Sequence, residues 1–374
     1  MLVINEEQQM LKTSAKELLK EAGSIENHLR RLRDAKDEKG YDQTLWQQMV
    51  EMGLTALTIP EAYGGLDFGH TGLGQVMEEM GRTLTASPMM STVLLSTTAI
   101  NLGSNVTQKE TLLPAIAEGK LIIGFACDEG KHHNPHNIAT VAKGRRGSFV
   151  LTGTKAMVAD GHVANKFIVT AKTSDGDIGL FIVDADAEGV TVESNLYMDS
   201  RYYSEVILTD VKVSEHAELE TYESGAALLD KTLDIARVGL AAEMLGSVQE
   251  AFERTLGYIK EREQFGVVIG KFQALQHRMA ILFGEIELCK SVVIKALKAI
   301  DADSEDMSRL ASLAKAKLGE IYKLASNEGV QMYGGIGMTD DEEIGFFLKR
   351  ARVVQQLLGD TNFHLDRLAK MKRY

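Results

Sequence analysis

The sequence predicts an α+β protein with a helical N-terminal domain, a middle β domain of sandwich or barrel type, and a C-terminal four-helix bundle. Three observations predict this order. All four prolines, which break helix interiors, lie within residues 1–135. A middle stretch has short segments rich in Val, Ile, Phe and Thr, separated by Gly, Asp and Ser. Long helical patterns follow to the end of the chain. The predicted domains are 1–119, 120–225 and 226–374.

The N-terminal domain is expected to be mostly helical, because apolar residues recur there at helical spacing. A turn-rich loop interrupts it at Ile59–Gly65. The helices are expected at 6–21, 45–52, 73–80, 91–102 and 109–118.

The middle domain is expected to consist of short strands, since β-rich segments recur between turn residues. The strands are expected at 121–127, 148–152, 166–173, 179–184, 190–193 and 205–213.

The C-terminal domain is expected to pack four long helices as a bundle. They are expected at 226–260, 271–301, 307–333 and 342–372. In the third helix, apolar residues such as Leu310, Ala314 and Leu318 define one face, and Lys315 and Glu320 fall on the other.

Composition limits the class of partner. The 374 residues are 44% hydrophobic and carry a net charge of −12. We therefore expect no nucleic-acid and no membrane partner, because phosphate-rich surfaces attract clustered Lys and Arg. Cys127 and Cys289 are far apart in sequence, which favours a reducing compartment. The segment Met1–Lys20 has no apolar signal core, and no apolar run is long enough to cross a bilayer. We expect a cytoplasmic protein.

Two strings of residues in the predicted bundle contain the groups best suited to bind a ligand. The first is Arg262-Glu263-Gln264-Phe265-Gly266, followed by Ile269-Gly270-Lys271-Phe272-Gln273. The second runs from Gln331 to Gly337 and contains Gly334 and Gly335. An Arg side chain forms charge-assisted bonds to pyrophosphate, and glycine lets main-chain N–H groups approach phosphate oxygens. Each string alone is also compatible with a helix end or a simple turn. No dinucleotide-binding G-x-G-x-x-G or Walker motif is present.

Together these strings resemble the R-x-x-F-G-x-x-I-x-x-F-Q and Q-x-x-G-G-x-G signatures of the acyl-CoA dehydrogenase family, and their separation matches too. The resemblance implies an FAD cofactor whose adenine and pyrophosphate are held from across a subunit interface. By that resemblance the cofactor-binding residues are Arg262, Phe265, Gln273, Gln331, Gly334 and Gly335.

Weaker strings support the same resemblance. Pro60–Gly65 is similar to the family's P-x-x-Y-G-G loop, and Gly153-Thr154-Lys155 with Gly161 is similar to its G-x-K-x-x-I-T-N-G stretch. Asp234-Ile235-Ala236-Arg237 resembles the D-x-x-R string that contacts the pantetheine arm of acyl-CoA. Asp234 and Arg237 are therefore predicted substrate contacts, and a local ion pair is the alternative.

The chain departs from the family where a base is needed. The resemblance implies an α,β-dehydrogenation of an acyl-CoA thioester, in which a glutamate removes the α-proton. The two positions where the family places that glutamate are Leu358 and Ala236 here. The Leu358 main-chain N–H is still available to the thioester carbonyl by this reasoning. Asp128, Asp234 and Asp360 are other carboxylates, but none lies at a family base position, so the catalytic residue stays unknown.

The β domain departs too. The family's flavin-facing T-E-P-G-x-G-S-D stretch reads Cys127–Asn134, and the threonine and asparagine of its I-T-N-G string read Ala159 and Asp160. His132, His133 and His136 lie in a polar loop without further ligands at metal-site spacing, so we expect no metal.

Leu357-Leu358-Gly359-Asp360 is similar to an F-G-D version found in small subunits of paired bacterial acyl-CoA dehydrogenases, of pimeloyl-CoA dehydrogenase-like and steroid side-chain types. The leading hypothesis is an FAD-dependent dehydrogenase, active alone or as half of a heteromer. A structural subunit that completes a partner's FAD site is the second hypothesis, and a binding module without redox chemistry is the third. The family resemblance implies a dimer or tetramer and an electron-transfer flavoprotein partner.

Overall fold

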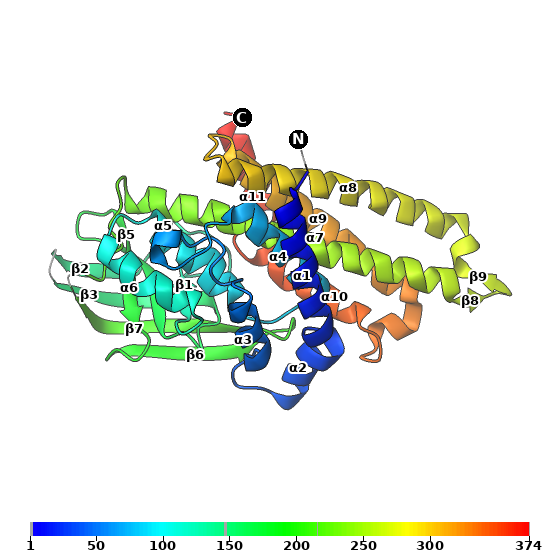
Figure 1. Cartoon of the computed structure of the whole chain (residues 1–374), viewed down its shortest axis with the longest axis horizontal. Coiled ribbons are helices and arrows are strands. Elements are labelled where there is room, and N and C mark those ends of the chain that lie inside the picture. Colours follow the sequence, from blue (N-terminus) through cyan, green and yellow to red (C-terminus); the bar gives the residue numbers. More distant parts are fainter. Residues whose placement is uncertain (1–2, 146–147, 215, 374) are drawn as a thin grey trace. The chain divides into compact units, whose positions relative to one another are not determined.

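The chain forms two compact units, which Figure 1 draws with their helices and strands. The computed structural model describes residues 3–145, 148–214 and 216–373. Unit 1 consists of Met1–Arg31, His70–Thr85 and Arg237–Tyr374, and unit 2 of Leu32–Gly69 and Ala86–Ala236. The predicted fold class is confirmed: a helical N-terminal part precedes a β domain, and long helices follow.

Unit 2 is built on a mixed sheet of seven strands among the described residues. The order is β1-β4-β2-β3-β7-β6, and β5 pairs with β4. β1 and β2 pair with β4 in parallel, and the other neighbours are antiparallel. Aromatic and β-branched side chains such as Phe149, Phe167, Phe181 and Val206 form its core. The strands are β1 (Ile123–Ala126), β2 (Val141–Arg145), β3 (Ser148–Ala159), β4 (Lys166–Lys172), β5 (Ile178–Asp184), β6 (Val190–Leu196) and β7 (Tyr202–Ser214).

The pattern of β-rich segments did not predict β2. Its segment, Val-Ala-Lys-Gly-Arg, buries only Ala142 fully among the side chains described, so it lacks the apolar alternation that marks a strand. It pairs because β3 and β4 offer it ladder partners on either side.

Short helices complete unit 2. A π-helix, η3 (Met89–Ser96), lies against β1, and the hydroxyl groups of Thr92 and Ser96 donate to the carbonyl oxygen of Ile123. The sequence expected one α-helix at 91–102, but the π-helix changes to α5 within that range. The remaining elements are α3 (Gln43–Glu51), η2 (Glu61–Tyr63), α5 (Thr97–Leu102) and α6 (Val106–Ala117). α2 (Arg31–Ala35) begins at the last residue of the first segment of unit 1.

Unit 1 is helical, and its central element is α9, which packs against α8, α10 and α11. A 3-10 turn, η5 (Gly334–Met338), ends α9. The helices are α1 (Glu6–Ala22), η1 (Ile25–Arg30), α4 (Gly69–Thr83), α7 (Gly225–Glu261, shared with unit 2), α8 (Gln273–Asp301), α9 (Met307–Tyr333), α10 (Ile344–Gln356) and α11 (Thr361–Met371).

The prediction of one long helix over 342–372 was wrong. Two helices, α10 and α11, occupy that range, and the chain turns between them at Leu357–Asp360. Leu358 and Gly359 both take positive φ values, 58° and 103°, which no α-helix contains. Asp360 then caps α11, because its side chain accepts from the N–H of Phe363 at 2.8 Å.

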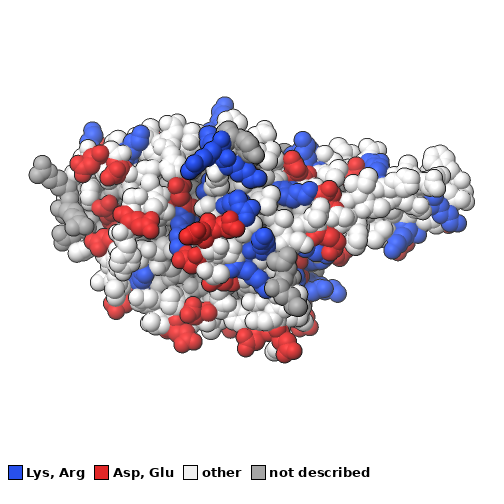
Figure 2. All heavy atoms as spheres, turned by 90° about the horizontal axis from the view of Figure 1, so that it is seen from above, with Lys and Arg blue, Asp and Glu red and all other residues white. Residues whose placement is uncertain are grey.

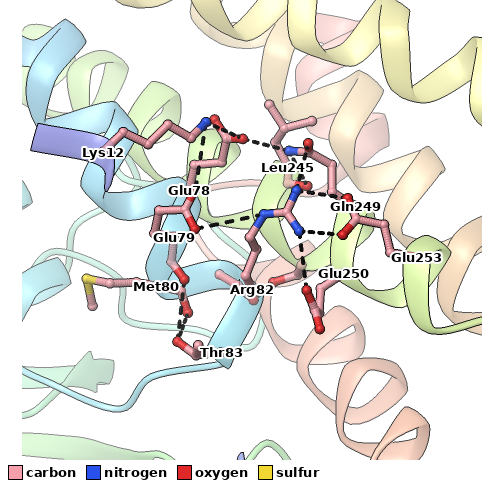
Figure 3. A network of polar contacts seen from close by, with 12 residues as sticks. Lys12, Glu78, Glu79, Met80, Arg82, Thr83, Leu245, Gln249, Glu250 and Glu253 are labelled. Atoms are coloured by element: carbon pink, nitrogen blue, oxygen red, sulfur yellow. Dashed lines mark hydrogen bonds and ion pairs between the residues drawn. The ribbon is translucent and has the colours of Figure 1, made fainter. Parts of the chain in front are cut away.

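A partly buried ionic network joins α1, α4 and α7 within unit 1 (Figure 3). Glu78 accepts from the ammonium group of Lys12 at 2.8 Å and from the amide of Gln249 at 2.7 Å. Arg82 donates to Glu253 at 2.9 Å and to Gln249 at 3.2 Å. Each polar group here has a partner of opposite charge or dipole, so these helices pack without isolated buried charges.

Within the described residues, none of the helices combines the length and the apolar character needed to cross a bilayer. Figure 2 shows acidic and basic side chains interspersed over one face, without a large surface of a single sign.

Candidate functional site

The first motif string forms a projecting hairpin where α7 ends and α8 begins (Figure 1). Two-residue strands, β8 (Glu263–Gln264) and β9 (Val267–Val268), pair in an antiparallel ladder. Phe265 and Gly266 form the turn with φ values of 54° and 77°, the positive pair typical of a type I′ hairpin turn. At the base of the hairpin, the N–H of Ile269 donates to the carbonyl of Arg262 at 2.8 Å. This arrangement places Arg262 directly after the last turn of α7.

The second motif string lies beside this hairpin. The rings of Tyr258 on α7 and Tyr333 on α9 stack with centroids 4.0 Å apart. Met332 belongs to one apolar cluster with Ile259 and Ile269, and Tyr258 packs against this cluster. The ends of α7 and α9 are therefore held together, and the two motif strings meet at one end of unit 1.

All six predicted cofactor-binding residues are exposed at this end. Phe265, an apolar side chain, is 90% exposed at the hairpin apex. Its ring centroid lies 6.2 Å from that of Phe272, which is also exposed, so two aromatic side chains face solvent here. The residues are Arg262, Phe265, Gln273, Gln331, Gly334 and Gly335.

The chemistry of this surface fits the adenine and pyrophosphate end of FAD. A Cβ atom built on Gly334 or Gly335 would meet nothing within 4 Å, so the main chain there is open to a ligand. Gly334 has φ 69° and ψ −143°, a conformation open to glycine but not to other residues. Arg262 supplies a guanidinium group for phosphate oxygens, and Gln331 and Gln273 supply amide groups.

Leu358, the first position where the family keeps its glutamate, lies just after the C-terminal end of α10. Leu358 is 6% exposed and lies in the turn between α10 and α11. Its carbonyl oxygen accepts from Arg237 Nε at 3.0 Å, and His364 Nε2 lies 3.0 Å away. Arg237, one of the two predicted substrate contacts, thus holds the main chain of this turn.

The second base position, Ala236 on α7, is fully buried and apolar. Neither position carries a proton acceptor. Asp360, one of the alternative carboxylates, is engaged as the cap of α11. Asp128 accepts from the N–H of Asn134 at 3.2 Å, and its other oxygen lies 2.8 Å from His133 Nδ1. Asp234, the third alternative and the other predicted substrate contact, is fully buried on α7.

The divergent stretch of the β domain is ordered by its own ionic contacts. Glu129 accepts from the buried Lys155 ammonium at 2.6 Å and from the N–H groups of Ala139 and Thr140. Burial opposes ionisation of Glu129, but these donors outweigh it and hold the pKa of its carboxyl below the usual value. Asp160 accepts from the hydroxyl of Ser91 at 2.6 Å. Asp128 and Glu129, which differ from the family pattern, therefore stabilise the loop at 127–140, whereas Asp160 binds Ser91 of η3.

Two histidines of this loop lie beside carboxylates: His133 beside Asp128, and His136, whose Nε2 lies 2.9 Å from an oxygen of Asp230. Over the described ranges, no group of three His, Cys, Asp or Glu residues is arranged to hold a metal ion.

Lys315 was expected on the face of α9 away from the apolar residues, but the structure buries it. α9 is covered by α8, α10 and α11, so that face is interior too. Lys315 Nζ donates to the carbonyls of Val354 at 3.0 Å, Gln355 at 3.2 Å and Gly359 at 2.9 Å. Burial, together with the Arg237 guanidinium, lowers the pKa of Lys315 to about 7, against the opposing charge of Asp360. The small residues around it, including Ala311 and Gly319, were the available sequence signal that this face is also packed.

Known proteins resemble the chain along its length. Models of the acyl-CoA dehydrogenase N-terminal, middle and C-terminal domains match residues 5–120, 126–211 and 223–372. A 3-(aryl)acrylate reductase of Clostridium sporogenes is 30% identical over 84% of this chain and 86% of that protein. A variant of the Tcur3481-Tcur3483 steroid ACAD is 30% identical with a TM-score of 0.90, over 98% of both chains. The ChsE4-ChsE5 complex of Mycobacterium tuberculosis shares the fold, with 23% identity and a TM-score of 0.92 over 100% of this chain and 99% of the matched one.

Proposed function

Because the chain belongs to the acyl-CoA dehydrogenase family, we propose that it is an FAD-dependent enzyme that oxidises the α,β carbon–carbon bond of an acyl-CoA thioester, alone or as one half of a heteromer. The observation that carries this proposal is the meeting of the two motif strings at one exposed end of unit 1. The family models also support the proposed division into domains 1–119, 120–225 and 226–374.

The exposed end is proposed to bind FAD that lies mainly on a second subunit. Arg262 would neutralise the pyrophosphate, and the open main chain of Gly334 and Gly335 would donate to its oxygens. Phe265 and the glutamine side chains would contact the adenine end. The bound FAD supplies the acceptor for the two electrons that the thioester loses. A surface that serves a neighbour's cofactor requires at least a dimer, and we propose a homo- or hetero-oligomer.

The other end of the bundle is proposed to hold the thioester. Dehydrogenation removes the α-hydrogen as a proton and the β-hydrogen as a hydride, and the developing charge on the carbonyl oxygen needs fixed donors. The Leu358 main-chain N–H is the proposed donor from this chain. Asp234 and Arg237 are proposed to contact the substrate. In the structure, Arg237 Nε donates a hydrogen bond to the carbonyl oxygen of Leu358.

The leucine at position 358 favours a role as one half of a heteromer, because this side chain cannot accept the α-proton. The steroid ACAD at 30% identity is named after two proteins, Tcur3481 and Tcur3483. This name supports the proposal of a two-chain assembly. The second candidate function, a structural subunit that completes a partner's FAD site without chemistry of its own, rests on the same substitution. An electron-transfer flavoprotein is the proposed electron acceptor. We also propose a cytoplasmic location, because Cys127 and Cys289 lie far apart in sequence, which favours a reducing compartment.

Flavin content tests the proposal. Purified chain, alone or co-expressed with its partner, is expected to be yellow and to lose most of its flavin in Arg262→Ala. Lys260→Ala is the matched control, because it removes an exposed positive charge two residues earlier on α7. A colourless wild-type assembly, or unchanged flavin in Arg262→Ala, would overturn the proposed site.

Bleaching of the flavin separates the two candidate functions. If the chain alone is yellow and bleaches on addition of an acyl-CoA, it is catalytic by itself. If bleaching requires the partner, the chain is half of a heteromer. If the partner alone, supplied with excess FAD, bleaches at the rate of the whole assembly, the structural role is favoured.

A further inference from the structure

The turn that joins α10 to α11 is held in a conformation that its own sequence disfavours. Leu358 has φ 58°, in the left-handed region where a residue with a branched side chain is strained. Such a conformation persists only where surrounding contacts enforce it. Two of the contacts that enforce this turn come from helices distant in sequence, α7 and α9.

Lys315 makes contact on both sides of the turn. Its ammonium group donates to Val354 and Gln355, whose carbonyls belong to the last turn of α10, and to Gly359, which precedes the cap of α11. The last carbonyls of a helix lack intrahelical partners and attract positive charge. One fully buried side chain from α9 therefore satisfies the end of α10 and fixes the start of α11.

Two other side chains meet at a single atom of the turn. Arg237 from α7 and His364 from α11 both meet the carbonyl oxygen of Leu358. Among the hydrogen bonds of the described chain, those of Lys315 span the turn from residue 354 to residue 359. The Lys315 amine matches this set of carbonyls, and a shorter side chain or one without N–H donors would leave at least one of them unpaired.

We propose that Lys315 is a positioning residue that sets the main-chain geometry of the Leu358–Gly359 turn and thereby the affinity of this chain for an acyl-CoA thioester. The part that concerns the thioester rests on the proposed function, because the Leu358 N–H is the proposed donor to the thioester carbonyl. The part that concerns the turn stands on the hydrogen bonds alone.

The position along α9 separates this role from flavin binding. Lys315 and Gln331 are sixteen residues apart on the same helix, about 24 Å at 1.5 Å per residue. A change at Lys315 should therefore alter the turn and leave the proposed FAD surface at the other end intact.

Hydrogen exchange of the 353–364 segment tests the first part. In Lys315→Met this segment is expected to exchange at least about tenfold faster than in the wild type, because three carbonyls lose their donor. Lys317→Met is the matched control on the same helix, since Lys317 pairs with Glu285 of α8 and not with the turn. Unchanged exchange in Lys315→Met, or equal acceleration in Lys317→Met, would overturn the positioning role.

Flavin spectra test the second part. Short, medium and long saturated acyl-CoA thioesters are titrated against the flavin-loaded assembly. In Lys315→Met the thioester concentration needed for half of the spectral change is expected to rise at least about tenfold. The flavin content of this variant is expected to equal that of the wild type. Loss of both flavin and thioester binding would indicate general damage and contradict the proposal, as would an unchanged titration. A wild-type assembly that ignores every thioester contradicts the proposed function, and the exchange result still decides whether Lys315 positions the turn.

If Lys315→Met does not fold, Lys315→Gln replaces it, because the shorter amide keeps two N–H donors. The wild type gives an independent check: the 353–364 segment should exchange more slowly than the exposed 334–340 segment. Equal exchange in these two segments would mean that the turn is not held, and would contradict the proposal.

Discussion

The guanidinium Nε of Arg237 lies 3.0 Å from the carbonyl oxygen of Leu358, so the two positions of the proposed thioester region are hydrogen-bonded to each other. The guanidinium also lies 5.5 Å from the centre of the Phe363 ring. The first turn of α7 within unit 1 is thus tied to the end of α10 and the start of α11. This relationship leads to the first prediction.

Replacement of Arg237 by methionine is expected to lower the free energy of unfolding by about 1.5–3 kcal/mol, because a charge-assisted bond to a buried carbonyl is lost. Urea denaturation followed by tryptophan fluorescence or circular dichroism measures this change. Arg352→Met, which removes an exposed guanidinium on α10, is the control and is expected to change stability by less than about 0.5 kcal/mol. Equal effects of the two variants would show that the Arg237–Leu358 bond adds little.

Gly359→Ala is expected to destabilise the chain by at least about 2 kcal/mol. Gly359 has φ 103°, and a Cβ there would lie 2.5 Å from Phe363 Cδ1 and 2.8 Å from His364 Nε2. Gly335→Ala should leave stability within about 0.5 kcal/mol, since its Cβ would meet nothing within 4 Å. The same Gly335→Ala variant is expected to lose flavin, because the Cβ would fill the space proposed for phosphate oxygens. Thermal melts and flavin absorbance separate the two effects, and a stable Gly335→Ala that retains full flavin would contradict the proposed FAD surface.

Leu358→Glu is expected to give the chain a base at the position where the family keeps one. If the proposed thioester region is correct, the rate of acyl-CoA dehydrogenation should rise by about 10²-fold or more, the usual contribution of a positioned base. Leu358→Gln has the same shape without a proton acceptor and should not raise the rate. Single-turnover bleaching of bound flavin measures the step. A rate for Leu358→Glu that equals that of Leu358→Gln would place the chemistry elsewhere.

The lowered pKa of Lys315 predicts a pH dependence of stability. Its native pKa is about 7, below the ordinary lysine value, so between about pH 7 and pH 10 the unfolded chain binds more protons than the native chain. The contribution of Lys315 to stability should therefore rise with pH through this window and be lost as the pH falls through about 7. The difference in unfolding free energy between the wild type and Lys315→Met, measured in urea at about pH 6 and about pH 9, should shift in favour of the wild type at the higher pH. A difference that is constant with pH would show that Lys315 does not titrate in this range.

The sequence was sufficient for most elements because the spacing of their apolar residues matches the faces that they bury. α8 and α9 begin and end within two residues of the predicted ranges. β4 and β5 have the continuous apolar runs of strands buried on both faces. β2 and the break between α10 and α11 were missed for the same reason: their conformations depend on neighbours rather than on their own residues. β2 gains its ladder from β3 and β4, and the Leu357–Asp360 turn gains its donors from α7, α9 and α11.

The sequence by itself determined the family, the order of helical, β-rich and helical regions, and the residues of the two motif strings. All of these are patterns of residue type and spacing. Only the tertiary structure decided that the strings meet through the Tyr258–Tyr333 stack, and that Lys315 is an interior donor rather than a surface charge. The physical reason is that helical periodicity reveals which residues share a face of a helix, but not how many faces other helices cover. α9 is covered on several sides, so a residue opposite its main apolar face is buried as well, and a lysine there must find main-chain oxygens as partners.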